Sequence, residues 1–326
     1  MKVLYHNQCF DGACSASMFT RFHRECIGTA ASYTYGGLAH KPGGLFQFAD
    51  FSGDENAVVD FKYSNDPRVT WWFDHHLSAF LTPEDLAEFE AGQTDGSQSM
   101  RKFFDPNYTS CTSFIAHIAA TKFGFDTSGL QELIYWADIV DGAKYESAKA
   151  AVEMEAPAMK LTMVIESAQD ETLIPRMIPL LTSMPLQEVL DQGFVQELVG
   201  PLMAKHVAGI DLIRERAVVD RGVISFDLMD QKMEGYSKFI PYYLHPEGTY
   251  VVGLSKSSFR TKISVGTNPW TTKPVSELIN LAEICERYGG GGHARVGAIS
   301  FPVDREDLAR VAAGEIEAEL RGVYRG

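Results

Sequence analysis

The feature that most constrains the fold is an apolar run, residues 68–73, that ends in one acid and two adjacent histidines. The run is short, rich in Val, Thr and aromatic residues, and follows the turn signal Asp66-Pro67, so it predicts a buried strand. Asp74, His75 and His76 then lie at the strand's carboxyl end, the edge where open α/β sheets bind ligands. Carboxylate and imidazole together suit Mn, Fe or Zn. A surface loop with two solvated histidines is the alternative.

Length and cysteine usage limit the class of protein. The chain has 326 residues, more than one hydrophobic core typically serves, so we expect two domains. No apolar stretch approaches the roughly 18 residues of a membrane helix, and the N-terminus turns polar too early for a signal peptide. The five scattered cysteines lack a CxxC pair, which indicates reduced thiols rather than disulfides or a zinc knuckle. We therefore expect a cytoplasmic protein that does not bind membranes.

The formal net charge of −14 limits the partners. A broad surface that follows a long nucleic acid would need positive charge. A short single-stranded nucleic acid or a small nucleotide, attracted by bound metal, is compatible with an acidic surface. The sequence does not determine the oligomeric state, and a homodimer is one option.

Two more acids accompany predicted strands. Residues 3–5 predict a strand that leads through His6 to Asp11-Gly12 and a helix of small residues, which is typical of a ligand-binding βα turn. Gly12 lets the backbone approach closely or adopt a positive φ. An aspartate at an ordinary helix N-terminus is the alternative. Residues 57–61 predict another buried strand, which carries Asp60 near its end.

The rest of the chain predicts helices, then short strands. Helices are expected at 84–96, 111–123, 130–140 and within 153–181, with a strand at 29–35 and a glycine-rich loop at 36–44. Asp138 and Asp141 are three residues apart and could face one pocket, or one of them could be solvated. Residues 186–218, interrupted by Gly200-Pro201, predict a connector. Beyond it we expect strands at 223–226, 250–254, 259–265 and 299–301, and helices at 276–288 and 305–320.

These elements predict an α/β protein. Its mainly parallel sheet, flanked by helices, spans 1–185, a helical connector spans 186–219, and a smaller α/β domain spans 220–326. In the last domain, four glycines at 289–292 precede His293 and Arg295. Backbone N–H groups of such a run can surround an anion, and Arg offers a bidentate fork for phosphate. A flexible linker is the alternative, and Arg260 on a neighbouring strand is a second candidate phosphate clamp.

The ordered motifs resemble the DHH phosphoesterase superfamily, in the branch with a C-terminal DHHA1 domain, over nearly the whole chain. They are Asp11-Gly12, Asp60, Asp74-His75-His76, Asp138 and Gly290 to His293. The resemblance implies hydrolysis of phosphoester or phosphoanhydride bonds with a pair of Mn²⁺ or similar ions. Members include oligoribonucleases, single-strand exonucleases, cyclic-dinucleotide phosphodiesterases and polyphosphatases.

The resemblance also implies residue roles. It makes Asp60 the bridging carboxylate, His76 a phosphate contact or proton donor, and Asp74 a residue that orients the ligands. The implied metal ligands are Asp11, His75 and Asp138. The implied substrate contacts are Gly291, Gly292 and His293, with Arg295 just beyond.

One position departs from the family pattern. Cys9 stands where many members have an additional Asp, and His6 is one residue out of register. Cys9 could ligate as a thiolate, which favours a softer ion than Mg²⁺, or could only pack. His6 is either a ligand or a substrate contact.

The leading hypothesis is a metal-dependent phosphodiesterase that cleaves short oligonucleotides or (di)nucleotides. It places a dinuclear site at the interdomain cleft, holding two Mn²⁺ ions, with Mg²⁺ or another divalent ion as the alternative. A polyphosphatase and a nucleoside-phosphate phosphatase are the enzymatic alternatives. The non-enzymatic alternative is a regulatory module that binds a phosphate ligand without hydrolysis. It is favoured by Cys9, which stands where many family members have an acid. A dehydrogenase is excluded, because the glycine run follows a helix and precedes a strand.

Overall fold

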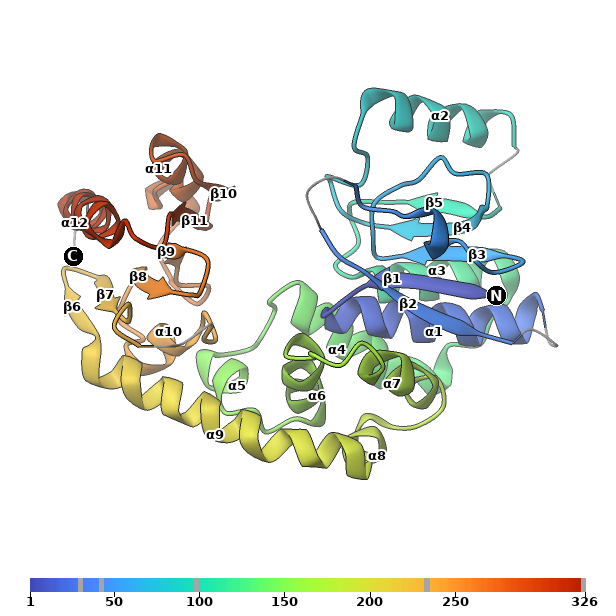
Figure 1. The fold of residues 1–326 in the computed structure, drawn as a ribbon, viewed down its shortest axis with the longest axis horizontal. Coiled ribbons are helices and arrows are strands. Elements are labelled where there is room, and N and C mark those ends of the chain that lie inside the picture. Colours follow the sequence, from blue (N-terminus) through green and yellow to red (C-terminus); the bar gives the residue numbers. More distant parts are fainter. Residues whose placement is uncertain (29–31, 41–43, 97–99, 232–234, 324–326) are drawn as a thin grey trace. The chain divides into compact units, whose positions relative to one another are not determined.

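The computed structural model describes residues 1–28, 32–40, 44–96, 100–231 and 235–323 (Figure 1). The chain divides into two compact units. The first contains Met1–Tyr145 and Met154–Gly200, and the second contains Glu146–Glu153 and Pro201–Gly326. Each unit has one β-sheet with helices packed on it, which confirms the α/β class. No helix among the described residues is both long and apolar enough to cross a membrane.

The first unit is built on a five-stranded parallel sheet in the order β2-β1-β3-β4-β5. Because all five strands are parallel, their carboxyl ends lie along one edge. The strands are β1 Lys2–His6, β2 Thr34–Leu38, β3 Asn56–Val59, β4 Val69–Asp74 and β5 Lys102–Phe104. Of the strand expected at 29–35, residues 29–31 lie outside the described residues, and residues 34 and 35 belong to β2. Gly36 and Gly37, which we expected in a loop, also belong to β2. The sequence did not predict β5, since three residues are too few to show alternation.

Strand β4 is buried on both faces. Trp71 and Phe73 point to one side, where both lie about 6 Å, ring to ring, from Phe19 of helix α1. Trp72 points to the other side, and its indole N–H donates to the Phe61 carbonyl oxygen at 2.9 Å. A strand covered on both faces reads as a continuous apolar run, which is why this one was recognisable.

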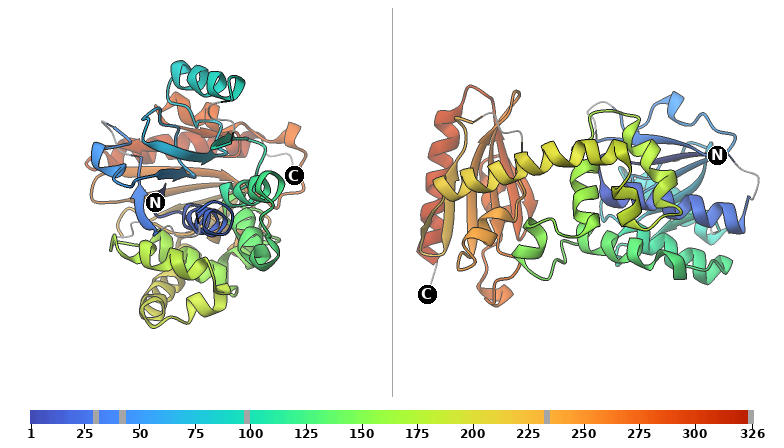
Figure 2. Two further views of the ribbon diagram at one scale, coloured as in Figure 1. Left: turned by 90° about the vertical axis from the view of Figure 1, so that its right-hand side faces the viewer. Right: turned by 90° about the horizontal axis from the view of Figure 1, so that it is seen from below.

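Helices cover the two faces of this sheet (Figures 1 and 2). Helices α1 (Phe10–Cys26) and α3 (Cys111–Phe123) pack together on one side, and α2 (Pro83–Thr94) lies on the other. Helix α3 begins at the Ser110 cap and ends at Gly124 in the left-handed conformation, so its predicted limits are confirmed. Helix α4 (Gln131–Asp141) packs on α1 and α3 after the short 3₁₀ turn Ser128–Leu130, and a further 3₁₀ turn lies at Phe48–Asp50.

The helical region after α4 is more divided than its composition suggested. It contains α5 Ala148–Val152, α6 Pro157–Glu166, α7 Leu173–Leu181, α8 Leu186–Leu190 and α9 Gly193–Arg216. Pro157 starts α6 at a position where its missing N–H costs nothing. Pro201 does not interrupt the connector as expected, because α9 continues through it.

The second unit contains a six-stranded sheet in the order β10-β11-β9-β8-β7-β6, in which β7 and β8 pair in parallel and the other neighbours are antiparallel. Its core includes Ala309, Ala312, Ala313, Ile316 and Leu320, which form the buried stripe of the last helix. The elements are β6 Val218–Asp220, β7 Val223–Asp227, α10 Ile240–Leu244, β8 Tyr250–Lys256, β9 Thr261–Thr267, α11 Leu281–Arg287, β10 Gly291–His293, β11 Val296–Phe301 and α12 Glu306–Val323.

Two element boundaries in this unit differ from those that the sequence predicted. The helix expected at 276–288 is a 3₁₀ turn, Val275–Glu277, followed by α11, because the Asn280 side chain accepts a hydrogen bond from Ala282 N at 3.2 Å and starts a new helix. Strand β9 begins after the turn at Ser257, whose hydroxyl accepts a hydrogen bond from Arg260 N at 3.3 Å.

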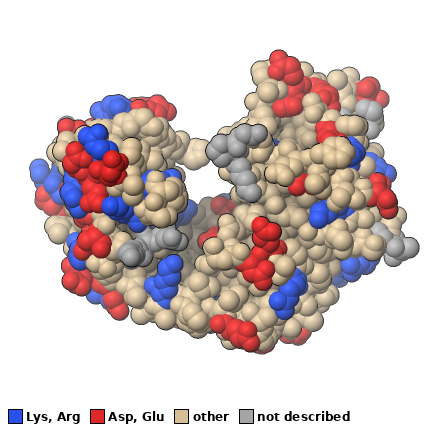
Figure 3. All heavy atoms as spheres, viewed as in Figure 1, with Lys and Arg blue, Asp and Glu red and all other residues tan. Residues whose placement is uncertain are grey.

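On the face that Figure 3 displays, acidic and basic side chains are intermixed over the described residues.

Candidate metal centre

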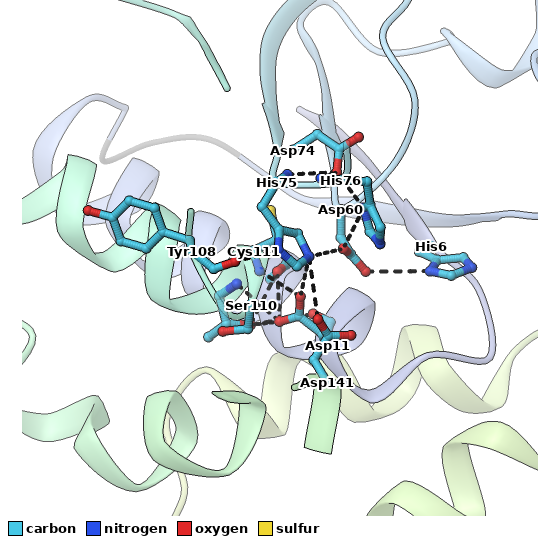
Figure 4. Close-up of polar contacts among 12 residues, drawn as sticks. His6, Asp11, Asp60, Asp74, His75, His76, Tyr108, Ser110, Cys111 and Asp141 are labelled. Atoms are coloured by element: carbon cyan, nitrogen blue, oxygen red, sulfur yellow. Dashed lines mark hydrogen bonds and ion pairs between the residues drawn. The ribbon is translucent and has the colours of Figure 1, made fainter. Parts of the chain in front are cut away.

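The carboxyl edge of the parallel sheet collects six side chains with nitrogen, oxygen or sulfur ligand atoms, together with Asp141 of α4 (Figure 4). They form three overlapping groups, in each of which the ligand atoms lie within 4.8 Å of one another. The groups are His6, Cys9 and Asp60; Asp60, His75 and His76; and Asp11, His75 and Asp141. Asp60 and His75 each belong to two groups, so the three form one continuous cluster.

Asp60 lies at the centre of the cluster. It follows β3 in the left-handed conformation, with φ of 56°, which is uncommon for a residue with a side chain and is typical of functional sites. Neither carboxylate oxygen accepts a hydrogen bond from a described residue, although both are buried. Burial alone would raise the pKa of Asp60, but the rings of His6 and His75 more than offset it, so the pKa is lowered.

Asp11 lies in the first turn of α1, against the start of α3. Its carboxylate accepts hydrogen bonds from Cys111 N at 2.7 Å, from Thr112 N at 3.0 Å and from the Thr112 hydroxyl at 2.6 Å. These donors and the positive end of α3 hold a negative carboxylate in place. Burial, and then the charges of Asp60 and Asp141, still raise the pKa of Asp11 well above its usual value. The site therefore concentrates more negative charge than the protein alone balances.

Gly12 allows this arrangement. A Cβ at this position would lie 2.1 Å from the His6 carbonyl oxygen, so only glycine lets α1 start directly against the end of β1. The close backbone approach expected from the sequence is thus present, without a positive φ.

The loop after β4 is organised by Asp74. One oxygen, Oδ1, accepts hydrogen bonds from His75 N at 2.8 Å, His76 N at 3.2 Å and His76 Nδ1 at 2.7 Å. Asp74 therefore holds the backbone of both histidines and the ring of His76, and its role in orienting metal ligands, which the resemblance implies, stays a prediction. The bond to Asp74 raises the pKa of His76 and leaves Nε2 of this half-exposed ring for another partner.

His75 is oriented by a main-chain group. Its Nδ1 lies 3.0 Å from the Tyr108 carbonyl oxygen, so we assign the proton to Nδ1. The other nitrogen, Nε2, is buried without a hydrogen bond and lies 3.5 Å from Asp141 Oδ2, 3.7 Å from Asp60 Oδ1 and 3.9 Å from Asp11 Oδ2. Burial lowers the pKa of His75, but Asp60 and the other carboxylates outweigh it and raise the pKa to about 10. A ring held through one nitrogen, with the other facing acids, is the usual geometry of a histidine metal ligand.

The two acids of α4 point in different directions. Asp138 Oδ1 accepts a hydrogen bond from the Ser110 hydroxyl at 2.6 Å and is not part of the cluster. Asp141 joins the cluster, and burial followed by the charge of Asp60 raises its pKa to about 6. Three residues on a helix leave an offset of about 60° and one turn of rise, enough to separate the two carboxylates.

His6 lies at the opposite oxygen of Asp60 from His75, and Cys9 belongs to the same ligand group as His6 and Asp60. Cys9 is the residue that caps α1 and has a free thiol. Burial, and then Asp60 and Asp11, raise the pKa of this thiol well above its usual value, so it is protonated in the metal-free protein. The His6 Nδ1 atom lies 3.5 Å from Asp60 Oδ2 and is buried without a hydrogen-bond partner.

The predicted residues of the second unit are dispersed. Gly291, Gly292 and His293 form β10, with His293 exposed, rather than a loop around an anion. Arg295 donates to the Asn268 carbonyl oxygen at 3.0 Å. Arg260 donates to the Ser300 hydroxyl at 3.2 Å. The register of β9 and β11 pairs Phe301 with Thr261 and Val296 with Gly266, so Arg260 and His293 lie at opposite ends of β9.

Sequence reasoning missed the groups that hold the ligands in place. These include the Tyr108 carbonyl and the amides of Cys111 and Thr112. Every residue has these main-chain groups, so the type of residue in the sequence does not indicate which of them hold a ligand. Ser110 had a usable signal, since a serine before an apolar helix predicts a cap.

The cluster fits divalent cations. Among the described residues, five buried atoms at this edge lack hydrogen-bond partners: His6 Nδ1, both oxygens of Asp60, Asp74 Oδ2 and His75 Nε2. Buried polar atoms are rarely left unpaired, so this concentration needs an explanation. Carboxylate and imidazole donors within 4.8 Å of one another are the donor set that Mn²⁺ and similar ions accept.

No protein-family model matches the chain, and no curated protein sequence matches it either. Solved structures do share its fold. The pGpG-specific phosphodiesterase PggH from Vibrio cholerae has 17% identity and a TM-score of 0.67, and the match covers 97% of this chain and 99% of that one. The DHH domain of a member of a family of ribosomal proteins has 12% identity and a TM-score of 0.54, with coverage of 96% and 85%.

An exopolyphosphatase-related protein from Bacteroides fragilis has 14% identity and a TM-score of 0.51, with coverage of 98% of this chain and 93% of that one. The fold is therefore that of the DHH-domain proteins, and it extends over both units. The likeness inferred from the spaced acid and histidine motifs is confirmed at the level of fold.

Proposed function

We propose that this protein is a metal-dependent phosphodiesterase that hydrolyses short oligonucleotides or dinucleotides. The observation that carries the proposal is Asp60, a buried carboxylate with neither oxygen hydrogen-bonded and with histidines on two sides. A carboxylate in this state is costly unless cations neutralise it. Its position at the carboxyl edge of a parallel sheet is where such folds bind ligands.

In this proposal, Asp60 would bridge the two ions, one on each side of its carboxylate. Its Oδ2 faces His6 at 3.5 Å, and its Oδ1 faces His75 Nε2 at 3.7 Å. Asp11, His75 and Asp141 would hold one ion, with Asp141 in place of Asp138. Asp138 instead accepts a hydrogen bond from Ser110, the N-cap of α3. The first N–H groups of α3 donate to the Asp11 carboxylate. When bound, such ions supply Lewis acidity and an activated water.

The chain supplies a separate group for the phosphate. Asp74 fixes His76 through Nδ1, so Nε2 is directed away from Asp74 and can donate to a phosphate or to a departing oxygen. The hydrogen bond to Asp74 raises the pKa of His76, which favours the protonated, donating form of the ring. Gly291, Gly292, His293, Arg260 and Arg295 remain proposed substrate contacts, and the His293 side chain is exposed.

The substrate class follows from charge and likeness. A net charge of −14 disfavours long nucleic acids and leaves short ones. The structural neighbour PggH is specific for pGpG, which supports a dinucleotide as the first substrate to test. The likeness to an exopolyphosphatase-related protein makes polyphosphate the second. We propose Mn²⁺ as the ion, with Mg²⁺ as the alternative.

The test is hydrolysis of pGpG, a ribodinucleotide and polyphosphate, each in Mn²⁺ and in EDTA. Asp60→Asn should lose at least about a hundredfold in rate, since it removes the shared ligand. The matched control is Asp54→Asn, an exposed carboxylate before β3 rather than after it, which should retain full activity. If metal-loaded protein leaves all three substrates intact, the catalytic proposal is wrong and a phosphate-binding module takes its place.

A further inference from the structure

The two oxygens of Asp60 face different chemical surroundings. On the Oδ1 side lie the His75 and His76 rings, at 3.7 and 3.8 Å, and the carboxylates of Asp11 and Asp141 lie beyond His75. On the Oδ2 side lies His6, at 3.5 Å, and Cys9 completes that group. The first side therefore offers carboxylate oxygens and imidazole nitrogens but no sulfur, whereas the second offers one oxygen, one nitrogen and one sulfur.

The sulfur of Cys9 is placed as a ligand atom. Its Sγ, a ring nitrogen of His6 and an oxygen of Asp60 all lie within 4.8 Å of one another. Cys9 is the N-cap of the 17-residue helix α1, and its side chain makes no capping hydrogen bond, so the thiol is not committed to the helix start. Cys14 and Cys111 are also buried near Asp11, but neither belongs to a ligand group of the described residues.

A second observation points to a ligand on this side. His6 Nδ1 and Asp60 Oδ2 are both buried and lack hydrogen-bond partners, and they face each other beside the thiol. Asp60 is 1% exposed, so its unpaired oxygen is directed into the interior of the protein rather than toward solvent. Buried polar atoms normally have hydrogen-bond partners, so two unpaired atoms at one point are not explained by packing alone.

We propose that the centre is chemically asymmetric, with His6, Cys9 and Asp60 forming a half-site for a thiophilic divalent ion such as Zn²⁺, Fe²⁺ or Co²⁺. Asp11, His75 and Asp141 form the half-site for a harder ion such as Mn²⁺. The reason is ligand softness, because thiolate selects borderline and soft ions over Mg²⁺ and Mn²⁺. This inference rests on the proposed function, since it assigns different ions to the two sides of the same centre.

Cobalt distinguishes a sulfur ligand from packing. Co²⁺ bound to a thiolate gives a sulfur-to-metal charge-transfer band in the near ultraviolet, whereas Co²⁺ bound only to oxygen and nitrogen does not. The experiment titrates metal-free full-length protein with Co²⁺ alone and records this band together with the visible d–d absorption. We expect the band to saturate at one equivalent, while total binding reaches two.

Three variants identify the source of the band. Cys9→Ser should abolish it and weaken one Co²⁺ site by about tenfold or more. Cys9→Asp should abolish it while retaining Mn²⁺ binding at that site, since it supplies a hard ligand. Cys26→Ser, which alters an exposed thiol at the far end of α1, is the matched control and should keep the band unchanged.

The results that overturn the inference are equally specific. Co²⁺ binding without a charge-transfer band shows that Cys9 only packs, and a band that persists in Cys9→Ser shows that another thiol is the ligand. Failure of wild-type protein to bind Co²⁺ overturns it as well. None of these readouts uses turnover, so an inactive protein with an intact band rejects the hydrolase proposal and leaves the asymmetric centre standing.

Discussion

Replacing Asp141 by Asn should stabilise the metal-free protein and weaken its metal binding. In the folded protein, burial and the charge of Asp60 raise the pKa of Asp141 from 3.8 to about 6. A raised carboxyl pKa means that folding disfavours the charged form, so stability is lost as the pH rises from about 4 to about 6. Asparagine keeps the shape and removes the charge, so the variant avoids this loss.

The magnitude follows from the shift. About two pKa units correspond to about 3 kcal/mol, and because the side chain is 24% exposed, solvent screening reduces the expected gain to about 1–2 kcal/mol. Urea unfolding in EDTA at pH 8 should show this gain, and at pH 4 the two proteins should be equal. Saturating Mn²⁺ should reverse the order, since the wild type gains about 2.7 kcal/mol at a hundred times its Kd and the variant gains less.

The control for this prediction is Asp54→Asn, which should shift neither curve because that carboxylate is exposed. A variant at Asp141 that is less stable than wild type in EDTA at pH 8 would refute the reasoning. It would mean that the ion pair with His75, at 3.5 Å, outweighs burial and repulsion from Asp60.

Three other changes test the surrounding structure. Gly12→Ala places a Cβ 2.1 Å from the His6 carbonyl oxygen, so we expect a loss of more than about 2 kcal/mol in chemical denaturation together with weaker metal binding; unchanged stability would contradict the close approach. Trp72→Phe removes the 2.9 Å hydrogen bond to the Phe61 carbonyl and leaves that oxygen buried, at a cost of about 2–3 kcal/mol measured by urea unfolding. Burial lowers the pKa of His23 below 6.5, so the wild type should lose stability as the pH falls below about 6.5, and His23→Gln should lose less over the same range in thermal unfolding at several pH values; equal losses would show that another group titrates.

The sequence determined the parts of the fold that depend on local pattern. Residues 68–73 were predictable as a buried strand, because an apolar run this short needs cover on both faces, and β4 (Val69–Asp74) buries Trp71 and Trp72 on opposite faces. Helix α3 was predictable because its serine cap and terminal glycine lie at the two ends of an apolar stretch. The association of Asp11, Asp60 and His75 followed from a general rule, since parallel strands bring their carboxyl ends to one edge.

Local pattern failed where long-range contacts decide the conformation. Pro201 reads as a break, yet α9 runs through it, and the glycine run at 289–292 reads as a loop, yet three residues from Gly291 form a strand paired with β11. Strand β10 owes its existence to its partner, because its short glycine-rich sequence has no strand propensity of its own.

Which of Asp138 and Asp141 lies beside His75 was decided by the tertiary structure alone. Asp138 and Asp141 are indistinguishable by type and close in spacing, and only the packing of α4 against α1 and α3 turns one to Ser110 and the other to His75. The sequence by itself thus fixed which ligand atoms the chain possesses and which strand ends carry them. The tertiary structure decided which of these atoms share one buried volume, because distances between side chains on different elements depend on packing and not on spacing along the chain.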